Sequence, residues 1–320
     1  GFAGIALAKK LKNKPVQVVL LDKHNYHTFQ PLLYQVATGG IEAGSIAYPI
    51  RKVIHEHKDF YFRLCHVNEI DTKNNKVIAD IGELSYDYLV IATGSKTNYF
   101  GNKEIERNSI AMKTIPQSLS IRSLILENFE QALLSTDENE RNALINFVLV
   151  GAGPTGVELA GALAEMKNAI LHKDYPDLDV SKMQINLVQS GDRILNTMSE
   201  KSSEAAEKYL KKLGVNVLKN VRVTSYDGRS ISTNTDLVLE TATLIWTAGV
   251  QGALVNGLPA SSLVERVERI KVNEFNQVFG FENIFALGDI ASMVSEEYPQ
   301  GHPQVAQPAI QQGKLLGENI

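Results

Sequence analysis

The feature that most constrains this chain is a glycine-rich turn between an apolar strand and a helix. Residues 146–150 read Asn-Phe-Val-Leu-Val, and residues 151–156 read Gly-Ala-Gly-Pro-Thr-Gly. In a G-x-G-x-x-G turn the first glycine allows the bend, the second lets the backbone approach a pyrophosphate, and the third permits close packing of helix on strand. The helix predicted from Pro154 to about Ala169 adds partial positive charge at its amino terminus. The pattern predicts a dinucleotide site, and an ordinary strand–helix connection is the alternative.

A second, shorter copy opens the chain. Gly1-Phe2-Ala3-Gly4 begins at what would be the second glycine, so the opening strand and the first glycine are expected to be missing. A short helix and a buried strand over Val16–Asp22 follow. Asp22 comes 18 residues after Gly4, near the spacing at which an acid meets an adenosine ribose. A surface aspartate at a strand end is the alternative.

Composition excludes several classes of protein. At 320 residues the chain exceeds the size at which one core stops growing, so two domains are expected. The net charge of −4 gives no reason to expect nucleic acid as a partner. No apolar run is long enough for a transmembrane helix, and no signal peptide is expected.

The cysteine and histidine content narrows the redox chemistry. Cys65 is the only cysteine, which excludes an intramolecular disulfide and a thiol pair that relays electrons. The run His55-Glu56-His57-Lys58 lacks further ligands beside it. We therefore interpret it as a solvated helix end and expect no metal site.

Recurring βα units along the chain predict a doubly wound parallel α/β architecture. A strand over 86–92 leads into Thr93-Gly94, where small residues leave room for a ring or phosphate. A second strand leads into Gly288-Asp289, where the carboxylate either accepts hydrogen bonds from a sugar alcohol or caps a helix. A helix that begins near 113–116 carries a predicted core stripe of Leu119, Ile121, Leu124, Ile125, Phe129 and Leu133.

Together these stretches resemble the flavoproteins that carry two dinucleotide-binding domains. The resemblance rests on both glycine turns, on residues 89–94, on Trp246-Thr247-Ala248-Gly249 and on Ala286-Leu287-Gly288-Asp289, and it spans essentially the whole chain. It implies two Rossmann-like domains, with the NAD(P)H domain (113–250) inserted between two parts of the FAD domain (1–112 and 251–320). It also implies non-covalent FAD on the first domain, a nicotinamide dinucleotide on the second, and no metal.

Two further stretches resemble the type II NADH:quinone oxidoreductases, respiratory dehydrogenases that do not pump protons. One is His-Thr-Phe-Gln-Pro-Leu-Leu-Tyr-Gln at 27–35, and the other, at 306–313, matches that family's A-Q-x-A-x-Q-x-G quinone motif. Because Pro308 suits a first helical turn, a helix is predicted from about Gln307, its positive end directed towards the flavin. The amides of Gln307 and Gln311 would donate to quinone carbonyls. An exposed glutamine-rich helix without a ligand is the alternative.

The resemblance implies site residues position by position. Catalytic roles fall on Glu158, Gln307 and Gln311, with Glu158 ordering water or relaying protons, although a glutamate stabilised by the helix dipole is a comparable alternative. The implied FAD contacts are Gly1, Phe2, Ala3, Gly4, Asp22, Lys23, Thr28, Gln30, Val67, Ala92, Thr93, Gly94, Asp289, Ala306 and Gln307. The implied NAD contacts are Gly151, Gly153, Pro154, Thr155, Gly156, Glu158, Gln189, Ala248 and Gly249.

One departure from the family pattern concerns the choice of nicotinamide cofactor. Gln189 stands where NADH-selective relatives commonly carry an acid. Glutamine still accepts a hydrogen bond from the ribose but does not repel a 2′-phosphate, and Arg193 is a candidate phosphate partner. We therefore expect NADH as substrate, with NADPH tolerated.

The function that the resemblance implies is NADH oxidation through FAD with two-electron reduction of a membrane quinone. The protein would bind peripherally to the cytoplasmic face of a bacterial inner membrane, through a carboxy-terminal region expected to be absent here. The oligomeric state is left open, and a homodimer is one possibility. Two alternatives remain: an NAD(P)H reductase for a small iron–sulfur protein, and a redox-dependent binding module.

Overall fold

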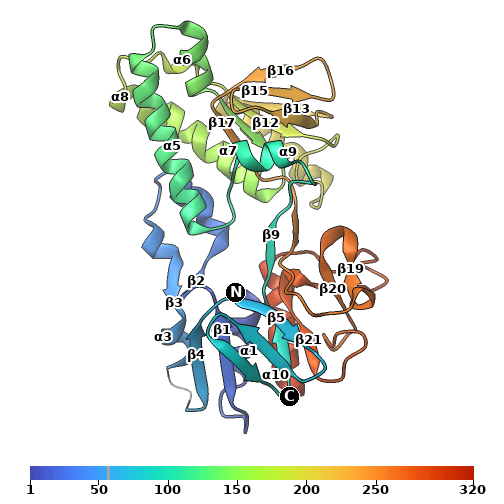
Figure 1. The fold of residues 1–320 in the computed structure, drawn as a ribbon. Helices are drawn as coiled ribbons and strands as arrows, with labels where there is room; N and C mark the ends of the chain where they lie inside the picture. Colours follow the sequence, from blue (N-terminus) through green and yellow to red (C-terminus); the bar gives the residue numbers. More distant parts are fainter. Residues whose placement is uncertain (56–57) are drawn as a thin grey trace. The chain divides into compact units, whose positions relative to one another are not determined.

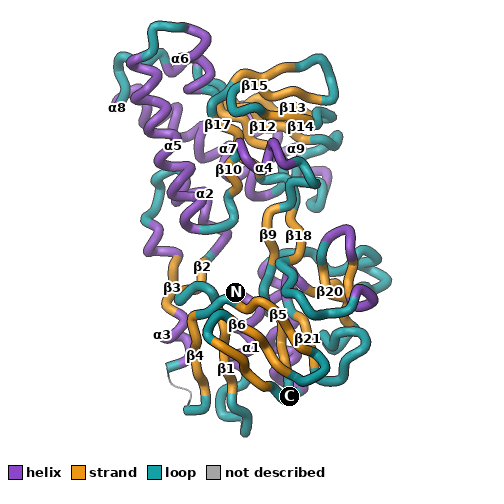
Figure 2. The backbone as a smooth tube through the Cα atoms, in the orientation of Figure 1, coloured by secondary structure: helices purple, strands orange, loops and turns teal. Residues whose placement is uncertain are grey.

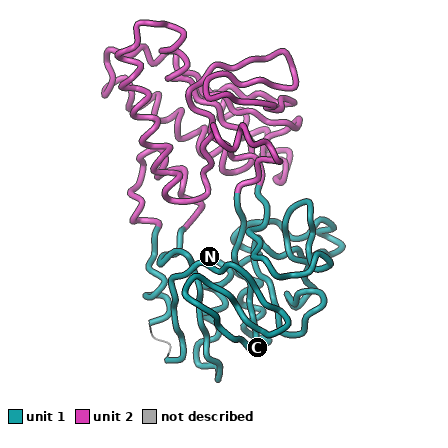
Figure 3. The backbone as a smooth tube through the Cα atoms, viewed as in Figure 1, with its two compact units in different colours: residues 1–28, 47–96, 250–320 teal, residues 29–46, 97–249 magenta. Residues whose placement is uncertain are grey.

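The computed structural model describes residues 1–55 and 58–320, which form two units (Figure 3). Unit 1 comprises Gly1–Thr28, Ala47–Lys96 and Val250–Ile320, and unit 2 comprises Phe29–Ile46 and Thr97–Gly249. In the predicted helix end at 55–58, Glu56 and His57 lie outside the described residues. Among the residues described, no cluster of three potential metal ligands occurs. None of the described helices has the length and apolar character needed to span a membrane.

Unit 2 is built on a five-stranded parallel sheet, whose strands lie in the order β10 (Ile110–Ala111), β17 (Thr243–Trp246), β11 (Phe147–Val150), β12 (Ile185–Gln189) and β13 (Val215–Lys219). Figure 1 labels β12, β13 and β17 of this sheet. Strands β11 and β17 are buried at every position, which explains their unbroken apolar sequence. On one face Phe147 packs on Phe129 of helix α5, with ring centroids 6.0 Å apart. On the other face Val148 packs with Tyr226 and Ile231 of a three-stranded antiparallel sheet.

The strands of unit 2 are β10 (Ile110–Ala111), β11 (Phe147–Val150), β12 (Ile185–Gln189), β13 (Val215–Lys219), β14 (Val223–Tyr226), β15 (Ser230–Thr233), β16 (Val238–Glu240) and β17 (Thr243–Trp246). Its helices are α2 (Leu33–Ala37), α4 (Lys103–Asn108), α5 (Ile115–Leu134), α6 (Glu138–Ile145), α7 (Pro154–Met166), α8 (His172–Asp174) and α9 (Glu200–Leu213). A π-helical turn over Lys167–Leu171 continues α7. Two 3-10 turns, Gln30–Leu32 and Ala43–Ile46, flank α2.

The antiparallel sheet β14-β15-β16 is an element that the parallel pattern did not predict (Figure 2). The segment 29–46 also belongs to unit 2, because α2 packs against α5 and α7. The division between Gly249 and Val250 lies within one residue of the boundary expected at 250, whereas the units divide at Lys96 and Thr97 and not at 112.

Unit 1 contains two parallel strand pairs, β1-β4 and β8-β21, together with sheets β5-β6-β7 and β19-β20-β22. Its strands are β1 (Val18–Asp22), β2 (Tyr26–Thr28), β3 (Ala47–Pro49), β4 (Phe60–Leu64), β5 (Val67–Asp71), β6 (Lys76–Ala79), β7 (Gly82–Ser85), β8 (Leu89–Ile91), β18 (Val250–Gly252), β19 (Leu263–Val264), β20 (Arg269–Val272), β21 (Ile284–Ala286) and β22 (Ala291–Met293), while β9 (Ser95–Thr97) ends in unit 2. Its helices are α1 (Phe2–Lys10), α3 (Ile50–Ile54) and α10 (Ala306–Asn319).

Helices α1 and α10 form a close pair in unit 1. A Cβ added to Gly313 would lie 2.5 Å from the carbonyl oxygen of Ala3, and one added to Gly317 would lie 2.7 Å from the side chain of Lys10. Real Cβ atoms do not approach other atoms so closely, so glycine is required at both positions. Ala3, Leu7, Ala309 and Leu316 fill the contact between the helices.

Candidate functional site

The glycine turn of unit 2 lies at the carboxyl edge of the parallel sheet, between β11 and α7. Strands β12 and β17 flank β11 on opposite sides, so the chain leaves β11 at the point where the strand order reverses. Open α/β sheets bind ligands at such switch points. The turn therefore occupies the position at which this class of sheet forms a binding site.

Two of the turn's glycines are required by the fold itself. Gly151 adopts φ +103°, and a Cβ there would lie 2.6 Å from the Cα of Ala248. A Cβ on Gly156 would lie 2.0 Å from the carbonyl oxygen of Gly151. The hydroxyl of Thr247 donates to the carbonyls of Val150 and Gly151, both at 2.9 Å, which ties the turn to the end of β17.

Gly153 is different, because nothing in the fold requires it. Its φ of −73° suits any residue, and a Cβ built on it meets no atom within 4 Å. The missing side chain leaves open space beside the first amide groups of α7. A phosphate fits such a cradle, and this observation supports a dinucleotide at the turn.

Gln189 reaches the same turn from the end of β12. Its Oε1 accepts a hydrogen bond from the N–H of Ala152 at 3.1 Å, which fixes the orientation of the amide. Among residues 1–55 and 58–320, no protein group accepts from its Nε2, so the amide presents a donor. Arg193 donates to the carbonyl of Asn196 at 2.8 Å.

Glu158 lies in the second turn of α7 and is exposed. The protein around its carboxyl group still removes part of the group's hydration, and this desolvation raises the pKa above the ordinary glutamate value. A carboxyl with a raised pKa can hold a proton nearer neutral pH, which is what a proton relay needs.

In unit 1, the residues after β8 and β21 meet at a second carboxyl edge. The two strands pair in parallel, and the N–H of Leu287 donates to the carbonyl of Ile91 at 2.9 Å. This pairing brings Ala92, Thr93 and Gly94 beside Gly288 and Asp289. The hydroxyl of Ser95 donates to Oδ2 of Asp289 at 2.6 Å and so orients that carboxylate. Asp289 lies within the 3-10 turn Gly288–Ile290 and does not cap a long helix.

The start of α1 joins this edge. A Cβ on Gly4 would lie 3.5 Å from the Cβ of Ala92, and nothing lies within 4 Å of one on Gly1. The rings of Phe2 and His27 pack edge to face at 4.8 Å, which brings β2 and its last residue, Thr28, to the same place. The other predicted FAD contacts are distributed more widely: Asp22 and Lys23 at the end of β1, Val67 at the start of β5, and Gln30 in unit 2.

The residues of the glutamine motif, 306–313, lie on two faces of helix α10, one exposed and one buried. Gln307 and Gln311 are exposed, one turn apart. Ala309 and Gly313 are buried against α1 and Gly288. Gln312, which was not predicted as a site residue, is 6% exposed and accepts a hydrogen bond from the N–H of Gly288 at 2.7 Å.

Among the described helices of six or more residues, the amino termini of α1, α7 and α10 differ from the others, while the shorter helices α2, α3 and α8 also lack a side-chain cap. In the described part of the chain, α4, α5, α6 and α9 each have a side chain that caps the first turn. No side chain caps α1, α7 or α10. First-turn amides without a side-chain cap are groups that can bind phosphate and other electron-rich ligands. These are the three helices at which the sequence predicted FAD, NAD and quinone.

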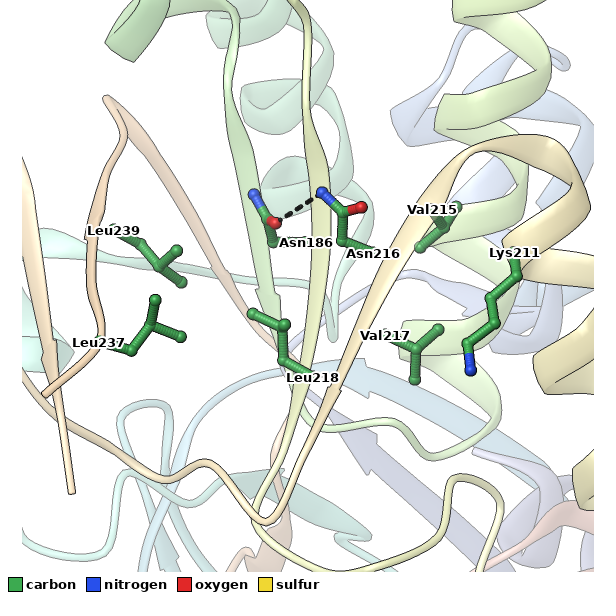
Figure 4. Close-up of a pocket in the computed structure, with 8 residues that line it drawn as sticks. All are labelled: Asn186, Lys211, Val215, Asn216, Val217, Leu218, Leu237 and Leu239. Atoms are coloured by element: carbon green, nitrogen blue, oxygen red, sulfur yellow. Dashed lines mark hydrogen bonds between the residues drawn. The ribbon is translucent and has the colours of Figure 1, made fainter. Parts of the chain in front are cut away.

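A groove of about 410 Å³ elsewhere in unit 2 does not coincide with these residues (Figure 4). It follows β13 and is lined by Asn216, Leu218, Leu237 and Leu239, with Asn216 donating to Asn186 at 3.1 Å. Asn186 lies near the amino end of β12, whereas Gln189 lies at its carboxyl end. Because ligands of such sheets bind at the carboxyl ends, we do not assign the nucleotide to this groove.

The fold and its two glycine turns define a class of redox proteins. The model of the pyridine nucleotide-disulphide oxidoreductase family matches residues 1–313. The solved structure of NDH2 from Plasmodium falciparum in complex with NADH superposes with a TM-score of 0.90 at 20% identity, covering 99% of this chain and 81% of that one. This likeness establishes the fold.

Sequence relatives narrow the class. The type II NADH:quinone oxidoreductase Ndh of Mycobacterium tuberculosis is 37% identical over 331 residues, covering 100% of this chain and 70% of that protein. The mitochondrial external alternative NAD(P)H-ubiquinone oxidoreductase B1 of Arabidopsis thaliana is 32% identical, covering 93% of this chain and 55% of that protein. The chain belongs to the type II NADH:quinone oxidoreductases.

Proposed function

We propose that this protein oxidises NADH through non-covalently bound FAD and passes two electrons to a membrane quinone, without proton pumping. The observation that carries the proposal is that, among the described helices of six or more residues, the three without a side-chain cap, α1, α7 and α10, are those at which FAD, NADH and quinone were predicted. The relatives' names, type II NADH:quinone oxidoreductase and NAD(P)H-ubiquinone oxidoreductase, support the same reaction. The single cysteine leaves no dithiol relay within the chain, which argues against disulfide chemistry.

Each site residue has a role that follows from its surroundings. The open space at Gly153 admits the nicotinamide dinucleotide's pyrophosphate, and the amides of α7 neutralise its charge. The amides of α1 do the same for FAD, and Asp289, oriented by Ser95, accepts from its ribityl hydroxyls. FAD held by these residues would supply the redox chemistry that links oxidation of NADH to two-electron reduction of the quinone.

The quinone is assigned to the exposed face of α10. Gln307 and Gln311 project side-chain amides from that face, and each amide can donate to a quinone carbonyl. Glu158 holds or delivers a proton. The domain assignment follows from these roles, with FAD bound by residues 1–112 and 251–320 and NADH by residues 113–250. Peripheral binding to the cytoplasmic face of a bacterial inner membrane and assembly as a homodimer belong to the same proposal.

The test is quinone turnover by the full-length, FAD-loaded protein with NADH and a soluble quinone. Gln311→Leu is expected to raise the KM for quinone about tenfold, because one hydrogen bond to the substrate is lost. Gln131→Leu on α5, which also removes an exposed helical glutamine, is the matched control and should leave KM unchanged. Turnover with ferredoxin or rubredoxin and negligible quinone reduction would overturn the proposal.

Glu158→Gln should affect stability and turnover separately. A raised pKa in the folded state means that ionisation of Glu158 costs stability as pH rises above its unfolded pKa, about 4. The glutamine variant is therefore expected to melt higher than the wild type at pH 7, with the difference disappearing near pH 4. Quinone turnover at pH 7 should fall about tenfold if Glu158 relays a proton. Unchanged turnover would remove Glu158 from the mechanism while leaving the stability effect intact.

A further inference from the structure

Arg269, at the start of β20, is a buried cation that the proposed mechanism does not use. The residue is 6% exposed. Its Nη2 donates to the carbonyl of Ala291 and, at 3.0 Å, to the carbonyl of His302. Its Nε is buried without a hydrogen-bond partner among the described residues. A buried guanidinium is costly unless the surrounding structure uses it, so its contacts indicate what it does.

The two carbonyls that Arg269 binds lie on different segments of unit 1. Ala291 is the first residue of β22 and comes two positions after Asp289. His302 belongs to the segment 294–305, which connects β22 to the amino terminus of α10. The side chain of Arg269 therefore hydrogen-bonds the connecting segment and also β22, the strand that follows the predicted FAD contact Asp289.

Other contacts hold the same segment. The N–H of His302 donates to the carbonyl of Met293 at 3.0 Å, and Nε2 of Gln304 donates to the carbonyl of Asp289 at 3.0 Å. Gly301, with φ +88°, passes so close that a Cβ on it would lie 2.9 Å from the hydroxyl of Ser292 and 3.3 Å from Nη1 of Arg269. The segment therefore closes over the guanidinium without space for a side chain at Gly301.

Arg269 also interacts electrostatically with Asp289. Burial lowers the pKa of the guanidinium, and the negative charge of Asp289 opposes that shift. The negative charge of Asp289 therefore favours the charged form of the buried guanidinium.

We infer that Arg269 is a positioning residue that fixes residues 294–305, and hence the entry to α10 with Gln307 and Gln311, against the strand beside Asp289. The inference rests on the proposed function for its consequence, since α10 is the proposed quinone helix. Its structural part, the fastening of 294–305, does not depend on that assignment. The segment leads to α10, the proposed quinone helix, whereas the glycine turn assigned to NADH lies in unit 2. Loss of Arg269 should therefore slow electron transfer to quinone and leave reduction of the flavin by NADH unchanged.

Two measurements on the full-length, FAD-loaded protein test the inference. The first is hydrogen exchange of the backbone amides in 294–305. Arg269→Met should speed this exchange about tenfold or more, because the fastening contacts are lost. Arg269→Lys keeps the charge and one hydrogen bond and should show an intermediate rate. Lys271→Met is the matched control, because Lys271 lies on the same strand and donates to the carbonyl of Ser261 at 3.1 Å outside this network.

The second measurement separates the two half-reactions by anaerobic stopped flow. In Arg269→Met, the rate of flavin reduction by NADH should stay within about twofold of wild type, while reoxidation by a soluble quinone slows about tenfold. Gly301→Ala should slow reoxidation as well, since its Cβ crowds the guanidinium, and it serves if the methionine variant fails to fold. FAD content and melting temperature are recorded for each variant.

The outcomes are distinct. Unchanged exchange in 294–305 would overturn the inference whatever the enzyme's substrate. Faster exchange with equal loss in both half-reactions would assign Arg269 to general stability and would also overturn the positioning role. A wild-type protein that quinone does not reoxidise would refute the proposed function, while the exchange measurement would still decide whether Arg269 fastens the segment.

Discussion

Replacing Gly153 with alanine is expected to raise the Kd for NADH about tenfold and to leave the melting temperature unchanged. A Cβ at this position meets no protein atom within 4 Å, and the backbone φ of −73° suits alanine. The added methyl group would instead enter the space assigned to the pyrophosphate, and a tenfold loss corresponds to about 1.4 kcal/mol. Fluorescence titration with NADH and calorimetric melting measure the two quantities.

Gly156→Ala is the matched control, because it adds the same methyl group to the same turn with the opposite expected result. Its Cβ would lie 2.0 Å from the carbonyl oxygen of Gly151, so the backbone must shift. We expect about 3 kcal/mol of destabilisation, seen as a lower melting temperature. Full NADH affinity in Gly153→Ala would contradict the assignment of the dinucleotide to this turn.

Gln189→Glu is expected to make the enzyme reject NADPH. The glutamate retains an acceptor for the N–H of Ala152, which Gln189 binds at 3.1 Å. It replaces the amide donor with a negative charge close to a 2′-phosphate, where repulsion between unit charges reaches about 4 kcal/mol in a partly shielded site. The ratio of kcat/KM for NADH to that for NADPH should therefore rise about a hundredfold, measured with one quinone at fixed ionic strength.

Arg193→Met tests the remaining source of phosphate affinity. Arg193 donates to the carbonyl of Asn196, so its guanidinium is already engaged within its own loop. If it nevertheless binds the phosphate, the variant should lose NADPH turnover and retain NADH turnover.

For Gln189→Glu, an unchanged ratio of NADH to NADPH turnover would show that residue 189 does not contact the substituent at the ribose 2′ position.

The sequence predicted those parts of the molecule in which local pattern and tertiary structure agree. The strand and helix around the glycine turn of unit 2 appear as β11 and α7, because an unbroken apolar run and a glycine turn permit few other structures. The helix predicted from about Gln307 appears as α10, beginning at Ala306. The family and its α/β fold were likewise predicted, because several long motifs with fixed spacing occur along the chain and each is typical of that family.

What the sequence did not predict depends on contacts between distant segments. Leu119 and Leu133 were placed in the core stripe of α5 but are 37% and 39% exposed, because helical spacing does not reveal how far a neighbouring element covers a helix. The antiparallel sheets were missed because their short strands leave little periodic signal. Arg269 and Gln312 gave no local signal, since each acts on carbonyl or amide groups about 20 or more residues away.

The division of α10 into two faces changes how its motif should be used to judge other sequences. Ala309 and Gly313 are small because α1 and Gly288 pack against them. This packing requires small residues whichever ligand binds the exposed face of α10. A distant homologue that conserves only these two letters would retain the helix pair and nothing more specific. Under the proposed function, the positions expected to discriminate between electron acceptors are the two exposed glutamines, Gln307 and Gln311. Scoring those positions separately should sort homologues by acceptor better than the eight-letter motif as a whole.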